Sequence, residues 1–267
     1  MIIIRYGEIA LKGRNRSTFE QILVNNIKLY LNENNLSYDK ISERRGRVFI
    51  HTDEKYDLSK VFGVVGFSHA LIAQSNLKDI NEKVSKVINF NEKTTFRVSV
   101  KRIDKKFKIK SNELEKQIGE YVLENTSAKV SLKNFQEEIG VEIYPKFSLI
   151  YSKKIKAIGG MPISSSKLLY CYIENDQDYL AAFFMMRRGS KVILVSKKKI
   201  GETWLDKYYK LKSIKINSLN EIKELSKLIV LGQNVNNFKI LDDEFIELRP
   251  LIALSDKEIK SKIEELK

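Results

Sequence analysis

The spacing of apolar residues near the start of the chain predicts a small α+β unit. Residues 2–11 form an apolar segment that predicts a strand, and residues 43–52 predict a second strand. Between these two segments, apolar side chains recur at helical spacing at Phe19, Leu23, Ile27 and Tyr30. Residues 17–20 read Ser-Thr-Phe-Glu, the pattern of a capping box at a helix start. We therefore expect strand, helix and strand within residues 1–56.

Residues 57–163 predict a second domain that contains both strands and helices. The stretch TTFRVSVKR at residues 94–102 alternates apolar and polar side chains, which is typical of a strand with one buried face. Asn112 precedes an apolar pattern of helical period and is expected to cap a helix. Residues 138–144 and 147–152 predict the two strands of a β-hairpin.

Residues 164–267 alternate between short apolar segments and amphipathic ones. Residues 167–173 and 191–196 are mostly apolar and predict two strands, and residues 178–188 between them predict a helix. Uniformly apolar short strands separated by helices indicate a parallel sheet with helices on its faces. Such sheets bind ligands beyond the carboxyl ends of their strands. The turn Ile-Glu-Asn-Asp-Gln-Asp at residues 173–178 falls at this place.

The charge of the chain narrows the choice of partner. Lys and Arg number 48 against 34 Asp and Glu, which gives a net charge of +14 and a pI of about 9.5. An excess of one sign points to a polyanionic partner, either nucleic acid or an acidic membrane surface. General lysine-rich composition is the alternative explanation.

Cysteine and hydropathy exclude several classes of protein. Cys171 is the single cysteine, so the chain forms no internal disulfide, cysteine zinc cluster or two-cysteine redox pair. The apolar start of the chain runs directly into charged residues, unlike a signal peptide. The longest apolar run, at residues 180–186, is far shorter than the ~20 residues of a membrane span. We therefore expect a cytoplasmic protein that has no membrane partner.

Basic residues gather in three segments that are candidates for RNA binding. Two lie in predicted turns of the first domain, and the third, KRIDKKFKIK, follows a predicted strand of the second domain. Each segment taken alone is also compatible with a solvated loop. The candidate residues are Lys12, Arg14 and Arg16, then Arg44, Arg45 and Arg47, and then Lys101, Arg102, Lys105, Lys106 and Lys108.

Several motifs together resemble one known family. IRYGEIALKGRNR at residues 4–16, VFGVVGFSHA, VSVKRIDKKF, LENTSAKVSLKN and GGMP occur in this order, followed by RRG at 187–189 and LRPLIAL at 248–254. This series resembles the tRNA 4-thiouridine synthetase family (ThiI type). The resemblance is specific over the first 165 residues and weaker between about 195 and 245.

The resemblance implies three domains and a tRNA partner. It implies a ferredoxin-like domain at 1–56, a THUMP domain at 57–163, and a Rossmann-like PP-loop pyrophosphatase domain at 164–267. In the family the first two domains grip the tRNA acceptor end, and the third adenylates a uridine so that sulfur can replace its oxygen. The resemblance also assigns Lys133 and Asn134 to an RNA-binding turn of the THUMP domain, and it favours a homodimer.

The ATP motif of the family is altered in this chain. Its pattern SGGxDS aligns with Ile173, Glu174, Asn175, Asp176, Gln177 and Asp178. A phosphate cradle needs backbone N–H groups that a ligand can approach closely, which glycine allows. We therefore expect a degenerate PP-loop that binds neither ATP nor another cofactor. The chain ends one helix beyond LRPLIAL, so we also expect this domain to be truncated.

Other chemistry for this turn is less favoured by the residues. The three carboxylates of Glu174, Asp176 and Asp178 suit a helix N-terminus more simply than a Mg²⁺ site, and no metal is expected. Cys171 lies inside a predicted buried strand, so we expect it to be a core residue and not a sulfur carrier. We therefore predict no catalytic residue in this chain.

Three functional hypotheses follow. The first is a tRNA-binding protein of the thiouridine-synthetase lineage without its own ATP-dependent catalysis, which presents tRNA to a partner modifying enzyme. The second is a subunit of a split or atypical tRNA uridine thiolation enzyme. The third is a binder of anionic surfaces without preference for tRNA, for which the net charge alone would suffice.

Overall fold

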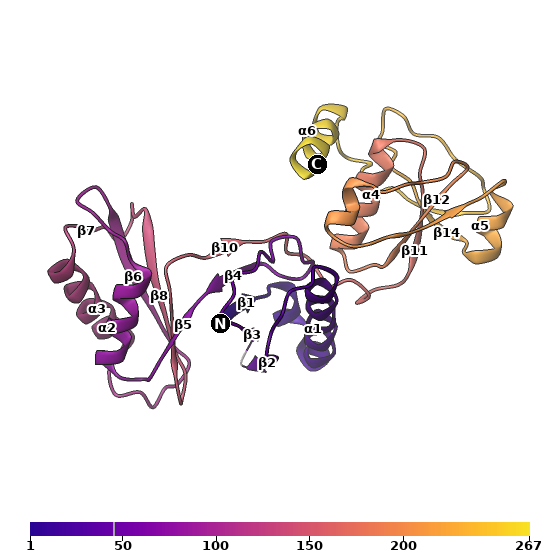
Figure 1. Cartoon of the computed structure of the whole chain (residues 1–267). Coiled ribbons are helices and arrows are strands. Elements are labelled where there is room, and N and C mark those ends of the chain that lie inside the picture. Colours follow the sequence, from indigo (N-terminus) through magenta and orange to yellow (C-terminus); the bar gives the residue numbers. More distant parts are fainter. Residues whose placement is uncertain (45) are drawn as a thin grey trace. The chain divides into compact units, whose positions relative to one another are not determined.

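The computed structural model describes residues 1–44 and 46–267, which form three five-stranded sheets with helices around them (Figure 1). The chain divides into two compact units. Unit 1 comprises Met1–Arg5, Ser37–Ser59 and Gly66–Lys156, and unit 2 comprises Tyr6–Leu36, Lys60–Val65 and Ala157–Lys267. The predicted boundaries of the three domains stay a prediction. The first predicted domain, residues 1–56, is divided between the two units.

The first sheet of unit 1 is antiparallel, with its strands in the order β10-β4-β1-β3-β2. The strands are β1 (Ile2–Arg5), β2 (Lys40–Arg44), β3 (Arg47–His51), β4 (Gly66–His69) and β10 (Ile155–Lys156). The middle strand β1 buries Ile2, Ile3 and Ile4 completely. The strand predicted at residues 2–11 is shorter than expected, since the chain leaves the sheet after Arg5.

The second sheet of unit 1 is mixed and carries two helices on one face. Its order is β5-β9-β8-β6-β7, with β6 parallel to both β7 and β8. The elements are β5 (Leu71–Ala73), α2 (Leu77–Val87), β6 (Thr95–Arg102), α3 (Ser111–Asn125), β7 (Lys129–Val130), β8 (Glu137–Ile143) and β9 (Ser148–Tyr151). The predicted strand at 94–102 and the predicted hairpin, which is β8 and β9, are confirmed.

The core of this second sheet explains the position of its helices. Phe96 and Ile139 of the strands and Ile118 of α3 are fully buried in one cluster. Asn112 was expected to cap α3, which is wrong: the helix begins at Ser111, and its N-cap is Lys110.

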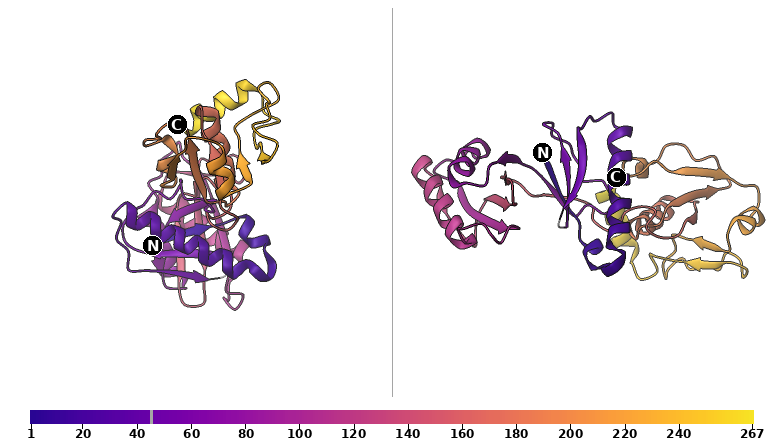
Figure 2. Two further views of the ribbon diagram at one scale, coloured as in Figure 1. Left: turned by 90° about the vertical axis from the view of Figure 1, so that its right-hand side faces the viewer. Right: turned by 90° about the horizontal axis from the view of Figure 1, so that it is seen from below.

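Unit 2 contains the predicted parallel sheet, in the order β13-β12-β11-β14-β15, and this prediction is confirmed. Its elements are β11 (Leu169–Tyr172), α4 (Asp176–Arg187), β12 (Val192–Ser196), η3 (Trp204–Lys207), β13 (Lys212–Lys215), α5 (Asn220–Leu225), β14 (Leu228–Val230), β15 (Ile246–Leu248) and α6 (Asp256–Leu266). Phe183 of α4 and Ile259 of α6 pack in one core, and Ile222 of α5 packs in another. The yellow α6 lies beside α4 (Figure 2).

Unit 2 also holds the segment that follows β1. Two short 3-10 helices, η1 (Glu8–Leu11) and η2 (Gly13–Asn15), lead into α1 (Arg16–Glu33). The predicted capping box at residues 17–20 is wrong, because α1 begins at Arg16 and Asn15 is its N-cap without a side-chain bond.

None of the helices in residues 1–44 and 46–267 combines the length and the apolar composition of a membrane span.

Candidate nucleic-acid interface

The loop after β6 contains the longest of the basic segments and is folded by one of its own arginines. Arg102 donates from Nη1 to the carbonyl oxygens of Phe107 at 2.8 Å and Ile109 at 3.1 Å. The backbone N–H of Lys106 donates to Oδ1 of Asp104 at 3.0 Å. Arg102 therefore holds the loop in shape, and its guanidinium is partly used inside the protein.

The lysines of this loop are available to an anionic partner. Lys105, Lys106 and Lys108 are exposed, and none of them has an ion-pair partner among the residues that the structure describes. Ammonium groups of this kind can neutralise RNA phosphates and release counterions. Lys101 differs, because partial burial and the nearby Arg47 guanidinium lower its pKa.

A buried carboxylate engages Arg47, which was a candidate for RNA binding. Glu142 of β8 is 1% exposed and lies between two arginines of the first sheet. Its Oε1 is 3.3 Å from Nη2 of Arg5, and its Oε2 is 3.5 Å from Nε of Arg47. The hydroxyl of Tyr144 donates to Oε2 at 2.8 Å. The Arg47 side chain therefore stabilises the contact between the two sheets of unit 1.

The other arginines of the β2–β3 hairpin were also candidates. Arg44 is exposed and lies opposite Arg47 in the register of β2 and β3. Two like charges opposite one another on paired strands are destabilising unless an anion is near. Glu142 supplies that anion for Arg47, and Arg44 has none among the described side chains. Arg45 lies outside the described residues.

The turn that contains Lys133 and Asn134 lies at the opposite end of β6 from the basic loop. Its shape is fixed by two bonds, from the N–H of Asn134 to the Ser131 hydroxyl at 3.2 Å and from the Thr95 hydroxyl to the Asn134 carbonyl at 3.2 Å. Both candidate side chains are exposed. Since β6 has 8 residues, its ends are about 23 Å apart. These two clusters are separate contacts and do not form one patch.

The third basic cluster lies in unit 2, on the 3-10 helices before α1. Arg16 is engaged, since its Nε pairs with Oε1 of Glu20 at 2.9 Å and its Nη2 donates to the Tyr6 hydroxyl at 2.8 Å. The Lys12 amine lies 5.0 Å from the centre of the Phe19 ring. Arg14 is exposed and has no ion-pair partner in the described part of the chain. Lys12 and Arg14 are the residues of this cluster that remain open to a ligand.

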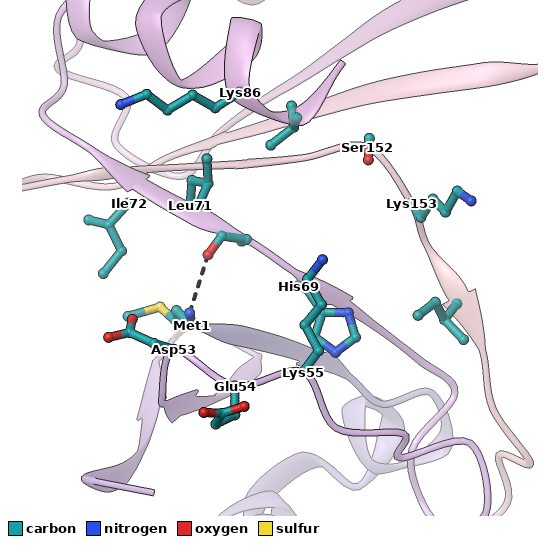
Figure 3. A pocket seen from close by; sticks show the side chains of 13 residues that line it. Met1, Asp53, Glu54, Lys55, His69, Leu71, Ile72, Lys86, Ser152 and Lys153 are labelled. Carbon is teal, nitrogen blue, oxygen red and sulfur yellow. Dashed lines mark hydrogen bonds between the residues drawn. The ribbon is translucent and has the colours of Figure 1, made fainter. Parts of the chain in front are cut away.

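A cavity of about 450 Å³ in unit 1 also has cationic side chains in its lining (Figure 3). Three lysines line it together with two carboxylates, those of Asp53 and Glu54. In Figure 3 the side chains of Lys86 and Lys153 extend away from one another. Because the charges have both signs and the amines do not converge, this cavity has no built anion site.

The turn after β11 shows how the chain uses the backbone groups of a phosphate cradle. Oδ2 of Asp178 accepts from the N–H groups of Glu174 at 2.9 Å and Asn175 at 3.0 Å. Oδ1 of Asn175, the N-cap of α4, accepts from the N–H of Gln177 at 2.9 Å. Two side chains of the turn thus occupy three of the N–H donors at this helix start, where phosphate binds in nucleotide enzymes.

A further bond links the turn after β11 to the segment after β14. These neighbouring strands mark the point where the strand order reverses, the usual ligand position in such sheets. Oδ1 of Asp178 accepts from the N–H of Gly232, just after β14, at 2.9 Å. A Cβ on residue 232 would lie 2.6 Å from Asp178, so this close approach requires glycine. Burial raises the pKa of Asp178, although its three N–H donors act in the opposite direction.

The other two candidate chemical groups of unit 2 are the carboxylates of the turn and the thiol of Cys171. Ile173 is buried, while Glu174 and Asp176 are exposed and do not converge with a third ligand. In the part of the chain that the structure describes, no group of three or more His, Cys, Asp or Glu side chains is placed to hold a metal ion. Cys171 is 1% exposed in the core, and burial raises the pKa of its thiol. A buried neutral thiol is a poor nucleophile.

Family models match the first part of the chain. The model of the ThiI ferredoxin-like domain matches residues 1–68, and that of the THUMP domain matches residues 74–153. A protein of Thermococcus kodakarensis named "Probable tRNA sulfurtransferase" is 34% identical, over 87% of this chain and 68% of that protein. The chain belongs to the tRNA sulfurtransferase family. The predicted ferredoxin-like, THUMP and parallel α/β fold is thereby confirmed.

Other relatives of the same name show how much of their length is matched. The Mycoplasmopsis synoviae protein is 34% identical over 92% of this chain and 61% of its own length, and the Methanocaldococcus jannaschii protein is 36% identical over 79% and 58%. For several others the matched share of the relative is 52%. The chain thus spans between about half and two thirds of the length of these relatives.

Two solved structures have the same fold. The crystal structure of PH1313 from Pyrococcus horikoshii Ot3 is 33% identical, with a TM-score of 0.85 over 99% of this chain and 98% of that one. A 4-thiouridine synthetase–RNA complex with bound ATP is 20% identical, with a TM-score of 0.81 over 99% of this chain and 84% of that one.

The predicted site residues do not include those that act through buried contacts. Glu142 is the charged residue of the buried stretch 139–143 in β8, and Arg5 ends the apolar strand β1, so each is visible in the sequence as a charge beside core positions. Gly232 gave no signal, because its role depends on a side chain 54 residues earlier in the chain.

Proposed function

We propose that this chain binds tRNA at the acceptor end, through its ferredoxin-like and THUMP domains, and serves tRNA modification without ATP-dependent catalysis of its own. The observation that carries the second half of this proposal is the carboxylate of Asp178. It accepts from the N–H groups of Glu174, Asn175 and Gly232, which are the donors that a nucleotide phosphate would need. A triphosphate would have to displace an anion that is built into the chain.

Binding to tRNA is supported by the family and by the charge. Relatives carry the name tRNA sulfurtransferase, and the solved relative of the same fold is a complex with RNA. The exposed lysines at 105, 106 and 108 offer phosphate contacts on a loop held by Arg102. Phosphate contacts of this kind position the RNA, and its folded shape supplies the specificity.

The test of RNA binding compares three ligands at about 150 mM salt: intact tRNA, the same tRNA without its single-stranded 3′ end, and duplex DNA of matched length. We expect trimming to weaken binding by tenfold or more. Equal affinity for all three would contradict the proposal and favour a binder that responds to charge alone. Changing Lys105, Lys106 and Lys108 together to Gln should make the salt dependence less steep.

The test of catalysis is tRNA-stimulated release of AMP from ATP. We expect none from this chain alone. Release of AMP at micromolar ATP would contradict the proposal and favour the second candidate, a subunit of a split or atypical tRNA uridine thiolation enzyme. The names of the relatives support that candidate. A homodimer, a partner modifying enzyme and a cytoplasmic location stay predictions.

A further inference from the structure

A second cavity of about 450 Å³ lies in unit 2, where the last turn of α4 lies beside η1. Its lining residues are Glu8, Phe184, Met185, Arg187, Arg188 and Pro250. Phe184, Met185 and Pro250 give it an apolar floor, and the two arginines supply positive charge. The arrangement of an apolar surface beside cations is the one that binds a nucleotide of a single strand, whose base stacks while its phosphates are neutralised.

The two arginines are exposed and only one has a partner. The Arg188 side chain is 71% exposed, with Nη1 3.7 Å from Oε2 of Glu8. Arg187 is exposed and has no ion-pair partner within residues 1–44 and 46–267. Cations in the last turn of a helix also offset its dipole. Offsetting the helix dipole does not require an apolar cavity beside the two arginines, so it does not explain the floor formed by Phe184, Met185 and Pro250.

The position of Arg187 is fixed by a glycine turn. Gly160 has a φ of 74°, and a Cβ at this residue would lie 2.3 Å from the Arg187 carbonyl oxygen. The N–H of Met161 donates to that same oxygen at 2.9 Å. The stem of Arg187 also lies against Gly160. The end of α4 is therefore held in place, which lowers the entropic cost of ordering its arginines against a ligand.

The basic cluster before α1 follows the cavity residue Glu8 along the chain. Glu8 lines the cavity and opens η1, and Lys12 follows four residues later, which is about 8 Å along a 3-10 path. Arg14 follows in η2. Leu11, the residue before Lys12, is an apolar side chain that is 86% exposed. The cavity itself is lined by two cations, Arg187 and Arg188, and by the carboxylate of Glu8, while Lys12 and Arg14 follow Glu8 nearby in the chain.

We propose that this cavity, lined by Phe184, Met185, Pro250, Arg187 and Arg188, binds an RNA strand, with its phosphates at the two arginines and one unpaired base on the floor at Phe184. It lies at the carboxyl end of α4, whose 12 residues span about 18 Å, and is thus remote from the closed turn at the other end. The inference rests on the proposed tRNA binding and gives the third predicted domain a direct part in it.

The test is the salt dependence of tRNA binding by the full chain with Arg187→Gln and Arg188→Gln combined. Each phosphate contact with a single strand contributes about 0.7 to the slope of log K against log salt. We expect the slope to become less steep by about 1.4, with roughly a tenfold loss of affinity at about 100 mM salt. The matched control is Lys212→Gln with Lys215→Gln, two exposed lysines of the edge strand β13 in the same unit. It should leave slope and affinity close to those of the unchanged chain.

A second variant tests the base contact. Phe184→Leu keeps an apolar side chain but removes the ring, so affinity for tRNA should fall about fivefold or more at an unchanged slope. Equal slopes for the arginine variant and its control would overturn the phosphate contacts, and unchanged affinity for Phe184→Leu would overturn the base contact. Neither result depends on the 3′ end of the tRNA. Failure of acceptor-end recognition is therefore distinguishable from failure of this inference.

Discussion

Replacing Glu142 by Gln should destabilise unit 1 strongly, because the buried carboxylate balances two arginines. The side chain of Glu142 is 2% exposed, and those of Arg5 and Arg47 are each 16% exposed. Breaking a buried ion pair by removing one partner costs about 3–5 kcal/mol. Gln can still accept from Tyr144, and the arginines reach some solvent. We therefore expect a loss of about 3 kcal/mol in the free energy of unfolding.

The assay is urea unfolding followed by circular dichroism, with hydrogen exchange in β8 as a local probe. Glu82→Gln is the matched control, because Glu82 also lies near two cations, Lys83 and Lys86, but is exposed to solvent. Exposed pairs contribute little, so this control should have no measurable effect. If Glu142→Gln unfolds at the same urea concentration as Glu82→Gln, the buried ion pair does not stabilise unit 1.

The same variant carries a pH signature. Burial alone would raise the pKa of Glu142, but Arg47 and Arg5 together lower it. A carboxyl group whose pKa is lower in the folded state contributes stability above its unfolded pKa and loses it as the pH falls through the folded value. The difference between the unchanged chain and Glu142→Gln should therefore be constant near neutral pH and shrink below about pH 4. A difference that grows on acidification would contradict the assigned charge.

Three further predictions concern single side chains. Asp178→Asn leaves at least one of the three N–H donors facing an amide N–H, so we expect the free energy of unfolding to fall by about 1–3 kcal/mol. Unfolding can be followed by the fluorescence of Trp204. Asp176 in the same turn is exposed, so Asp176→Asn should lower the free energy of unfolding by less than half as much. Arg102→Met removes both N–H donors to the Phe107 and Ile109 carbonyls, so hydrogen exchange in residues 103–110 should rise and tRNA affinity should fall severalfold; unchanged exchange would refute this role. Burial lowers the pKa of His69 below its usual 6.5, so the stability of unit 1 should fall as the pH drops through about 6.5, and His69→Asn should flatten this dependence in calorimetry.

The elements of the fold were predictable where their sequence pattern is local. The strands β6, β8 and β9 and the parallel sheet of unit 2 follow from period-two alternation and from short apolar runs. The starts of helices were less predictable. The residues Ser17 and Asn112 have capping side chains, but α1 and α3 begin at Arg16 and Ser111, before either residue could act as a cap.

The candidate site was predictable in composition but not in the engagement of each side chain. Arg47, Arg102 and Lys105 look alike as members of basic segments. In the folded chain Arg47 faces Glu142, Arg102 bonds two loop carbonyls, and Lys105 is exposed. Which contact each of these three side chains makes depends on residues that are tens of positions away in the sequence, or on the path of the loop. A charge pattern therefore indicates the type of partner, whereas the tertiary contacts select which cations can reach it.

The carboxylate of Asp178 can be regarded as a ligand that is covalently attached to its own binding site. A free ligand stabilises a protein in proportion to the logarithm of its concentration. A tethered one acts at a fixed, high effective concentration that dilution does not change. The turn after β11 should therefore have the same order at all nucleotide concentrations, and the melting temperature of unit 2 should not respond to added ATP.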